Sequence, residues 1–130
     1  MTDQLPFRSA LVTGASSGIG EAIVRVLAER GIPQVVVARR RERLDRLADE
    51  LPGIEVLVAD LTTDDGVVAV ADRIADTSRP LDILVNNAGF GTSGTFHTLD
   101  ADRLDREIVL NVRALTRLSR AALGVMVPRG

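Results

Sequence analysis

The residues best placed to do chemistry lie close to the start of the sequence, where two serines stand among three glycines. They form the stretch Gly14-Ala15-Ser16-Ser17-Gly18-Ile19-Gly20, between a short apolar run and an amphipathic one. A glycine-rich turn from a strand into a helix is typical of an anion site, because free backbone N–H groups and the positive helix end point toward the phosphate. A second strand follows that helix, and this βαβ context predicts a dinucleotide site.

Three other interpretations of the same turn lead to different functions. A Walker A loop needs a lysine after its last glycine, and the chain contains no lysine. Gly14 to Gly18 also has the spacing of a nucleophile elbow, with Ser16 as nucleophile and His97 as base, so a serine hydrolase is the alternative from another class. Against it, His97 lies in an irregular segment with no evident oxyanion donors. The simplest alternative is a turn that only joins a strand to a helix.

Composition excludes several other kinds of site. The 130 residues are predicted to form one domain, 1–130, with a buried core. The chain has no cysteine and one histidine, which excludes thiol chemistry and disulfides and leads us to expect no metal site. A net charge of -2 and 2% aromatic residues argue against a nucleic-acid partner. No apolar run approaches the roughly 20 residues of a membrane span, and Met1 to Arg8 does not resemble a signal peptide, so a cytoplasmic protein is expected.

The elements that must position the glycine turn follow from the apolar pattern. Short apolar runs predict strands at 9–13, 34–38, 54–59 and 81–85. Helical spacing predicts helices from Ile19 to the glycine at 31, over 41–51, from Thr62 with Asp65 three residues on, and from Asp100 or Asp102 to about Leu123, with a loop over 90–99. This alternation predicts an α/β fold of the Rossmann type, a doubly wound parallel sheet of strand order 3-2-1-4 that stops before a fifth strand.

The helical pattern also predicts which faces are buried. The inner face of the first helix is expected to comprise Ile19, Ala22, Ile23, Val26 and Leu27. The last helix is expected to bury Leu104, Ile108, Leu115, Leu118 and Ala122, with Asn111 in the middle of that stripe. Its opposite face carries Arg103, Arg106, Arg113, Arg117 and Arg120, for which a solvated surface is the simplest account.

Four motifs in register resemble the short-chain dehydrogenase/reductase family, from about Ser9 to the end of the chain. They are the glycine turn with Thr13 before it, Asp60-Leu61-Thr62 after the third predicted strand, Asn86-Asn87-Ala88-Gly89 after the fourth, and Asn111 in the last helix. The resemblance implies an oxidoreductase that transfers hydride between a nicotinamide cofactor and a carbonyl or alcohol substrate. It also implies that the last helix, over 101–123, can pack against a partner subunit in a homo-oligomer.

The resemblance assigns cofactor-binding roles to the matching residues. Gly14, Gly18 and Gly20 would form the turn under the pyrophosphate, together with Ile19, while Ser16 and Ser17 lie toward the adenosine. Asp60, followed by Leu61, would accept a hydrogen bond from the adenine amino group, unless it is an ordinary residue leading into a helix. Asn87, Ala88 and Gly89 would lie beside the cofactor ribose, and Asn86 would tie the strands together.

The residues after the second predicted strand indicate NADP rather than NAD. An NAD site usually carries an acidic residue there to bind the ribose hydroxyls, whereas this strand ends in Ala38 and continues Arg39-Arg40-Arg41. Guanidinium groups suit a 2′-phosphate. Positive charge at a helix start is otherwise unfavourable by about 0.3–1 kcal/mol each. We therefore expect Arg39, with Arg40, to bind the 2′-phosphate of NADP; the alternative is a solvated run of charge.

The family's catalytic residues are mostly missing from this sequence. The resemblance implies a tyrosine acid with a lysine four residues on and a preceding serine, but the chain contains no tyrosine and no lysine, and Asn111 alone remains in a supporting role. Two hypotheses stay open: a cofactor-binding piece of an NADP-dependent oxidoreductase, or a non-catalytic nucleotide- or partner-binding protein.

Overall fold

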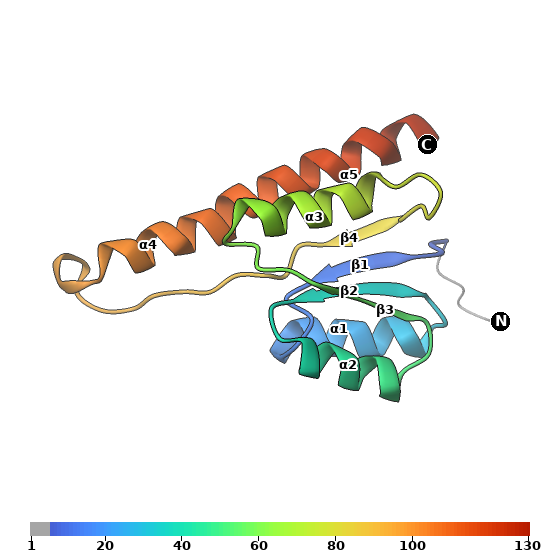
Figure 1. Cartoon of the computed structure of the whole chain (residues 1–130), viewed down its shortest axis with the longest axis horizontal. Coiled ribbons are helices and arrows are strands. Elements are labelled where there is room, and N and C mark those ends of the chain that lie inside the picture. The colour runs from blue at the N-terminus through green and yellow to red at the C-terminus, as the bar shows by residue number, and fades with distance from the viewer. Residues whose placement is uncertain (1–5) are drawn as a thin grey trace.

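A four-stranded parallel sheet forms the centre of the structure, a computed structural model that describes residues 6–130 (Figure 1). Its strands are β1 (Ala10–Thr13), β2 (Gln34–Ala38), β3 (Ile54–Val58) and β4 (Ile83–Val85), in the order β3-β2-β1-β4. The predicted Rossmann-type order is confirmed, and each strand begins and ends within two residues of its predicted bounds. The expectation about a signal peptide falls largely on residues 1–5, which lie outside the described part of the chain.

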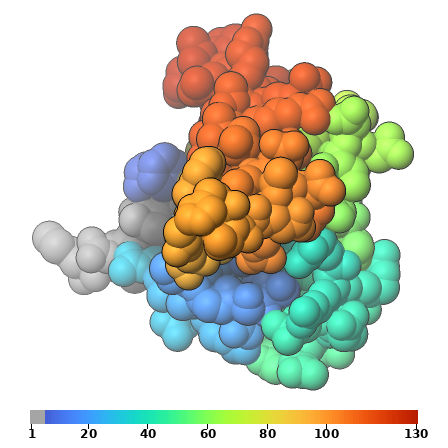
Figure 2. Space-filling model, turned by 90° about the vertical axis from the view of Figure 1, so that its left-hand side faces the viewer, coloured from blue at the N-terminus to red at the C-terminus, as the bar shows by residue number. Residues whose placement is uncertain are grey.

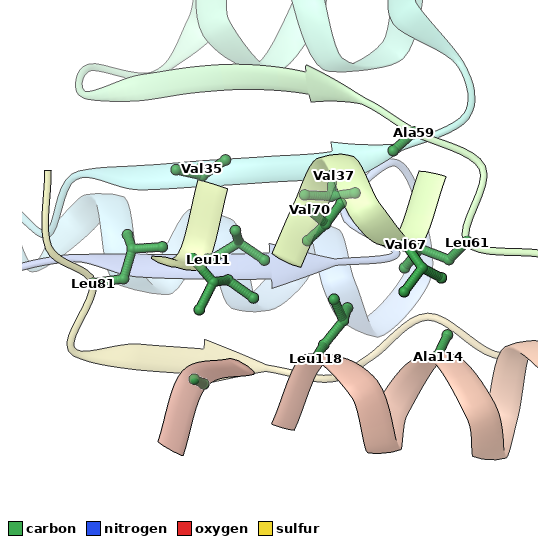
Figure 3. Packing of buried hydrophobic residues seen from close by; sticks show 12 residues of the cluster. Leu11, Val35, Val37, Ala59, Leu61, Val67, Val70, Leu81, Ala114 and Leu118 are labelled. Carbon is green, nitrogen blue, oxygen red and sulfur yellow. The ribbon is translucent and has the colours of Figure 1, made fainter. Parts of the chain in front are cut away.

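Helices cover both faces of the sheet (Figure 1). The helices α1 (Gly18–Glu29) and α2 (Arg41–Glu50) pack on one face, and α3 (Asp64–Ala75) and α5 (Leu115–Arg129) pack on the other. Because both faces are covered, most strand residues are apolar, as is typical of parallel sheets. On the α3 and α5 side, Leu11 and Val37 of the sheet meet Val70 and Leu118 of the helices (Figure 3).

The buried face of α1 differs from the predicted one. Gly20 and Leu27 are buried together with Val24, whereas Ile19 and Val26 are 73% and 51% exposed, so their predicted burial is wrong. The physical reason is Gly20, because its missing side chain lets this face of the helix lie directly against the backbone of the turn. The face of α1 that carries Gly20, Val24 and Leu27 therefore packs inward, and Ile19 and Val26 lie outside it.

The last helical stretch is longer than predicted and is not a uniform α-helix. It begins as α4 (Ala101–Ile108), capped by Asp100, continues through the π-helical segment η2 (Val109–Ala114), and becomes α5, which ends at Arg129 rather than near Leu123. Pro128 falls in the exposed final turn, and the Arg129 guanidinium donates a hydrogen bond to the Leu81 carbonyl.

The π-helical segment also explains why the predicted apolar stripe on this stretch is partly wrong. A π turn holds more residues than an α turn, so side chains before and after it no longer follow one 3.6-residue period. Ile108 and Leu115 are accordingly exposed, whereas Leu118 and Ala122 are buried as predicted. Packing of this stretch against a partner subunit stays a prediction.

Two further local expectations differ from the structure. The cap of α3 is Thr63, whose hydroxyl accepts a hydrogen bond from the Gly66 N–H at 3.0 Å, and not Thr62. The loop over 90–99 contains a short 3₁₀ helix, η1 (Phe96–Thr98).

Truncation of a buried leucine on α5 should cost more stability than truncation of an exposed one. Leu118 is 1% exposed and Leu123 is 57% exposed. We expect Leu118→Ala to lower the free energy of unfolding by about 2–5 kcal/mol, because a cavity opens between α5 and the sheet. Leu123→Ala, the matched control, should change it by about 0.5 kcal/mol or less. Urea unfolding followed by circular dichroism measures both, and equal losses would contradict the packing of α5.

Candidate functional site

A groove of about 780 Å³ lies at the carboxyl ends of the strands. Figure 2 looks onto this side of the molecule and shows α4, in orange, above the blue surface of the turn after β1 and the start of α1. The groove takes residues from the ends of all four strands and from α4. It is lined by Gly14, Ser16, Ser17, Ile19, Val37, Ala38, Arg39, Ala59, Asp60, Leu61, Thr62, Asn87, Ala88, Gly89, Phe90, Arg103, Arg106 and Leu110.

Two glycines, Gly14 in the turn after β1 and Gly20 at the start of α1, stand where a side chain would meet neighbouring atoms. Gly14 has φ +63°, and a Cβ there would lie 2.9 Å from Asn87 Nδ2 and 3.0 Å from the Ala88 backbone. A Cβ on Gly20 would overlap the Gly14 carbonyl oxygen. The missing side chains therefore bring the start of α1 against both the β1 turn and the segment after β4, and they leave the backbone open to the groove.

The amino end of α1 faces the groove without a side-chain cap. Ser17 is the N-cap residue, yet its side chain accepts no hydrogen bond from the first turn. The N–H groups that begin an α-helix have no partner within it, and the helix dipole makes this end positive. With Ser16, Ser17 and Ile19 lining the groove, this end can receive an anion.

Thr13, at the end of β1, joins this turn to the segment after β4. Its side chain is buried, and its hydroxyl oxygen accepts hydrogen bonds from the Asn87 and Ala88 N–H groups, each at 3.0 Å. The same hydroxyl donates to the Val85 carbonyl at 3.3 Å, and Asn87 Nδ2 donates to the Gly14 carbonyl at 3.1 Å. These four bonds join the end of β1 and its turn to the end of β4 and the segment after it, and together these segments form the floor of the groove.

Asp60 lies at the end of the groove beyond β3, and one of its two carboxylate oxygens is hydrogen-bonded to Thr62. One carboxylate oxygen accepts hydrogen bonds from the Thr62 N–H at 2.9 Å and from the Thr62 hydroxyl at 2.6 Å. Partial burial works to raise the pKa of Asp60, but the hydrogen bonds from Thr62 and the positive charge of Arg39 outweigh it and lower the pKa. The carboxylate is therefore ionised near neutrality, and its other oxygen has no hydrogen bond within the described residues.

Arg39 and Arg40 differ in position although they are neighbours in the sequence. Arg39 lines the groove beside Asp60, whereas Arg40 is the exposed N-cap residue of α2 and does not line it. The strand before them ends in Ala38, so that end of β2 presents a guanidinium and no carboxylate.

Asn111 is placed in the π-helical segment, and its amide pairs with the backbone of Phe90. Its oxygen accepts from the Phe90 N–H at 3.0 Å, and its nitrogen donates to the Phe90 carbonyl at 2.7 Å. It thus anchors the loop after Gly89. Asn86, expected to tie strands together, instead donates to the Ser119 hydroxyl of α5 at 3.0 Å.

Most of the residues predicted for the site line one groove. Gly18, Gly20, Arg40 and Asn111 are the predicted residues that do not line it; two of them shape the turn and Asn111 holds the neighbouring loop. His97 is exposed in η1, away from the groove that contains Ser16. Sequence reasoning assigned no role to Thr13, although a lone polar residue at the end of an apolar buried strand was a usable signal.

Comparisons with known proteins identify the family. The family model described as short chain dehydrogenase matches residues 8–130. The chain belongs to this family. Oxidoreductase UcpA of Salmonella typhimurium is 35% identical over 130 residues, which cover 97% of this chain and 49% of that protein. L-xylulose reductase of Mus musculus is 35% identical over 123 residues, which cover 95% of this chain and 49% of that protein.

Solved structures of the family share this fold. A short-chain dehydrogenase from Sphingobium yanoikuyae in complex with NADPH is similar with a TM-score of 0.89 and 42% identity, over 94% of this chain and 49% of that one. This chain spans about half the length of the curated relatives it matches. Among residues 6–130, no helix is both long and apolar enough to cross a membrane.

The hydroxyl of Thr13 should be essential to the floor of the groove. Thr13→Val keeps the shape of the side chain but leaves the Asn87 and Ala88 N–H groups without their acceptor, and each unsatisfied buried group costs about 1–3 kcal/mol. We expect a clear fall in the urea midpoint of unfolding. Thr13→Ser, which retains the hydroxyl, is the control and should stay closer to the unaltered protein. Equal stability of Thr13→Val and the unaltered protein would contradict this role.

The pKa of Asp60 should respond to its hydrogen bond with Thr62. Because the folded pKa lies below the ordinary value, the stability that Asp60 contributes is present above the unfolded pKa and is lost as pH falls through the folded pKa. Thr62→Val removes the hydroxyl donor and should raise the pKa of Asp60, measured by NMR titration of its carboxyl carbon. Thr62→Ser should keep it low. No difference between the two variants would show that the hydroxyl does not stabilise the carboxylate.

Proposed function

We propose that this chain binds NADP(H) in the groove and supplies the nucleotide-binding part of a short-chain oxidoreductase. The observation that carries the proposal is the joining, in one groove, of the uncapped amino end of α1, the ionised Asp60 and the guanidinium of Arg39. These groups suit a diphosphate, an adenine amino group and a 2′-phosphate respectively. Residues 1–130 are proposed to act as a single nucleotide-binding unit.

The cradle around the turn supports a diphosphate ligand. Side chains at Gly14 and Gly20 would meet neighbouring backbone, so the turn offers bare N–H groups where a phosphate needs them. Asn87, Ala88 and Gly89 line the floor next to it, where they would contact a ribose. The oxygen of Asp60 that Thr62 does not engage would accept a hydrogen bond from the adenine amino group.

The preference for NADP over NAD rests on the end of β2. A carboxylate there would repel a 2′-phosphate, but the strand ends in Ala38 and Arg39 follows into the groove. The NADPH complex of the Sphingobium relative, and that of an L-sorbose reductase from Gluconobacter frateurii, support the same choice.

Hydride exchange with a carbonyl or alcohol is proposed for the whole protein and not for this chain alone. The bound nicotinamide would supply the hydride chemistry. The chain contains no tyrosine or lysine to move the accompanying proton, and Asn111 is engaged by the Phe90 backbone. We therefore propose that the chain binds the cofactor without turnover. No contact in the described residues favours the serine hydrolase, because His97 and Ser16 do not line the groove together.

Removal of the Arg39 charge should weaken NADPH selectively. Loss of a hydrogen bond to a charged group costs about 1.5–3 kcal/mol, which corresponds to roughly 10- to 100-fold in affinity. We expect Arg39→Gln to lower the affinity for NADPH by this factor and to leave that for NADH within about 3-fold. Arg43→Gln, an exposed arginine of α2 that does not line the groove, is the charge-matched control.

Cofactor fluorescence titration measures these affinities, with circular dichroism to verify the fold of each variant. Equal affinities of the unaltered chain for NADPH and NADH would defeat the NADP assignment. Absence of binding to either cofactor by a folded sample would defeat the proposed function itself.

A further inference from the structure

The wall of the groove opposite the glycine turn is cationic. Arg103 and Arg106 of α4 line the same groove as Arg39, and Asp60 is the one carboxylate among the lining residues. Asp60 forms no ion pair with either of these two arginines among residues 6–130. A groove of this charge balance favours an anionic ligand.

Helical spacing directs these two side chains to the groove. Arg103, Arg106 and Leu110 follow each other at three and four residues, so they share one face of the helical stretch. Leu110 is half-buried against the core between the sheet and α3. Its inward position turns the same face, and the two arginines on it, toward the carboxyl ends of the strands.

Arg103 is held in place within the groove lining. Its guanidinium lies 5.0 Å from the centre of the Phe90 ring, and its Nε donates to the Thr92 hydroxyl at 3.1 Å. Phe90 is in turn anchored by Asn111. A guanidinium stacked on an aromatic ring keeps its charge and its remaining N–H donors available to a ligand. No acidic partner of Arg103 or Arg106 is found among residues 6–130.

The other arginines of this helical stretch are placed differently. Arg113 forms an ion pair with Asp64 at the start of α3, and neither Arg117 nor Arg120 lines the groove. All five arginines are exposed, as the predicted solvated surface requires, but they divide into a pair that lines the groove and an outer set that does not.

We propose that Arg103 and Arg106 form a second cationic wall that attracts the phosphate groups of the bound dinucleotide from the side opposite α1. The proposal rests on the proposed function and extends it to two residues of α4. The phosphate it recognises is either the diphosphate, shared by both nicotinamide cofactors, or the 2′-phosphate of NADP(H). In both cases the interaction is electrostatic and weakens as salt is added.

Neutral substitutions of the two arginines test the wall in the full chain. We expect Arg103→Gln and Arg106→Gln each to weaken NADPH binding by about 3- to 10-fold at low salt, and the double variant to weaken it further. Arg106→Lys, which keeps the charge, should recover most of the affinity. Arg117→Gln, an exposed arginine of α5 outside the groove, is the matched control and should bind as the unaltered chain does.

Comparison of NADPH with NADH distinguishes the two phosphate sources. Equal losses for the two cofactors identify the diphosphate, and a larger loss for NADPH identifies the 2′-phosphate; either supports the wall. Titrations at about 50 and 200 mM salt add a readout that a purely structural role would not move, because loss of a phosphate-attracting charge reduces the salt dependence of binding.

If the unaltered chain binds NADPH and both glutamine variants match Arg117→Gln in affinity and in salt dependence, the wall does not act on the ligand and the proposed function stands without it. If the folded, unaltered chain binds neither cofactor, the proposed function fails and this inference fails with it.

Discussion

The carboxyl edge of this sheet depends on how closely two backbone turns approach each other. The turn after β1 lies against the segment after β4, because Gly14 and Gly20 carry no side chain to keep them apart. Thr13 and Asn87 then join the two turns through hydrogen bonds to backbone groups. Buried polar groups must be paired, so these bonds both satisfy the strand ends and fix the floor of the groove. A larger residue at either glycine would separate the parts that the ligand must contact together.

Groups of the protein itself set the charge around this floor. The uncapped end of α1 contributes partial positive charge, and Arg39 adds a full charge at the end of β2. Burial works to raise the pKa of Asp60, but the two hydrogen bonds from Thr62 and the charge of Arg39 lower it, so its carboxylate stays negative. Its negative charge is thus confined to the end of the groove beyond β3. The remainder of the groove is left positive, which is the distribution that a ligand with phosphates at its middle and an amino-bearing base at one end would match.

The sequence was sufficient for the sheet order, because each apolar run such as Val35 to Val37 is short, buried on both faces and followed by a helical pattern. The same reasoning located the groove, since residues that end parallel strands meet at one edge. The prediction of buried helix faces failed where contacts between distant parts of the chain override the 3.6-residue apolar period. In α1, the side of the helix that carries Gly20 packs against the backbone of the turn. Ile19 and Val26, on other sides of the helix, are therefore exposed. Side-chain partners such as Thr13 with Asn87 join positions that lie more than 70 residues apart, and no spacing rule reveals them.

The π-helical segment links the failed helix prediction to the shape of the site. One extra residue in a turn rotates everything after it by about 100° relative to a regular α-helix. Leu118 and Ala122 can therefore pack on α3 and the sheet while Arg106 and Leu110, before or within the segment, face the groove. Asn111 lies in the same segment and binds the Phe90 backbone, and Phe90 in turn holds Arg103. The local irregularity that defeats a 3.6-residue pattern is thus what allows one continuous helical stretch to serve both as a core helix and as a wall of the groove.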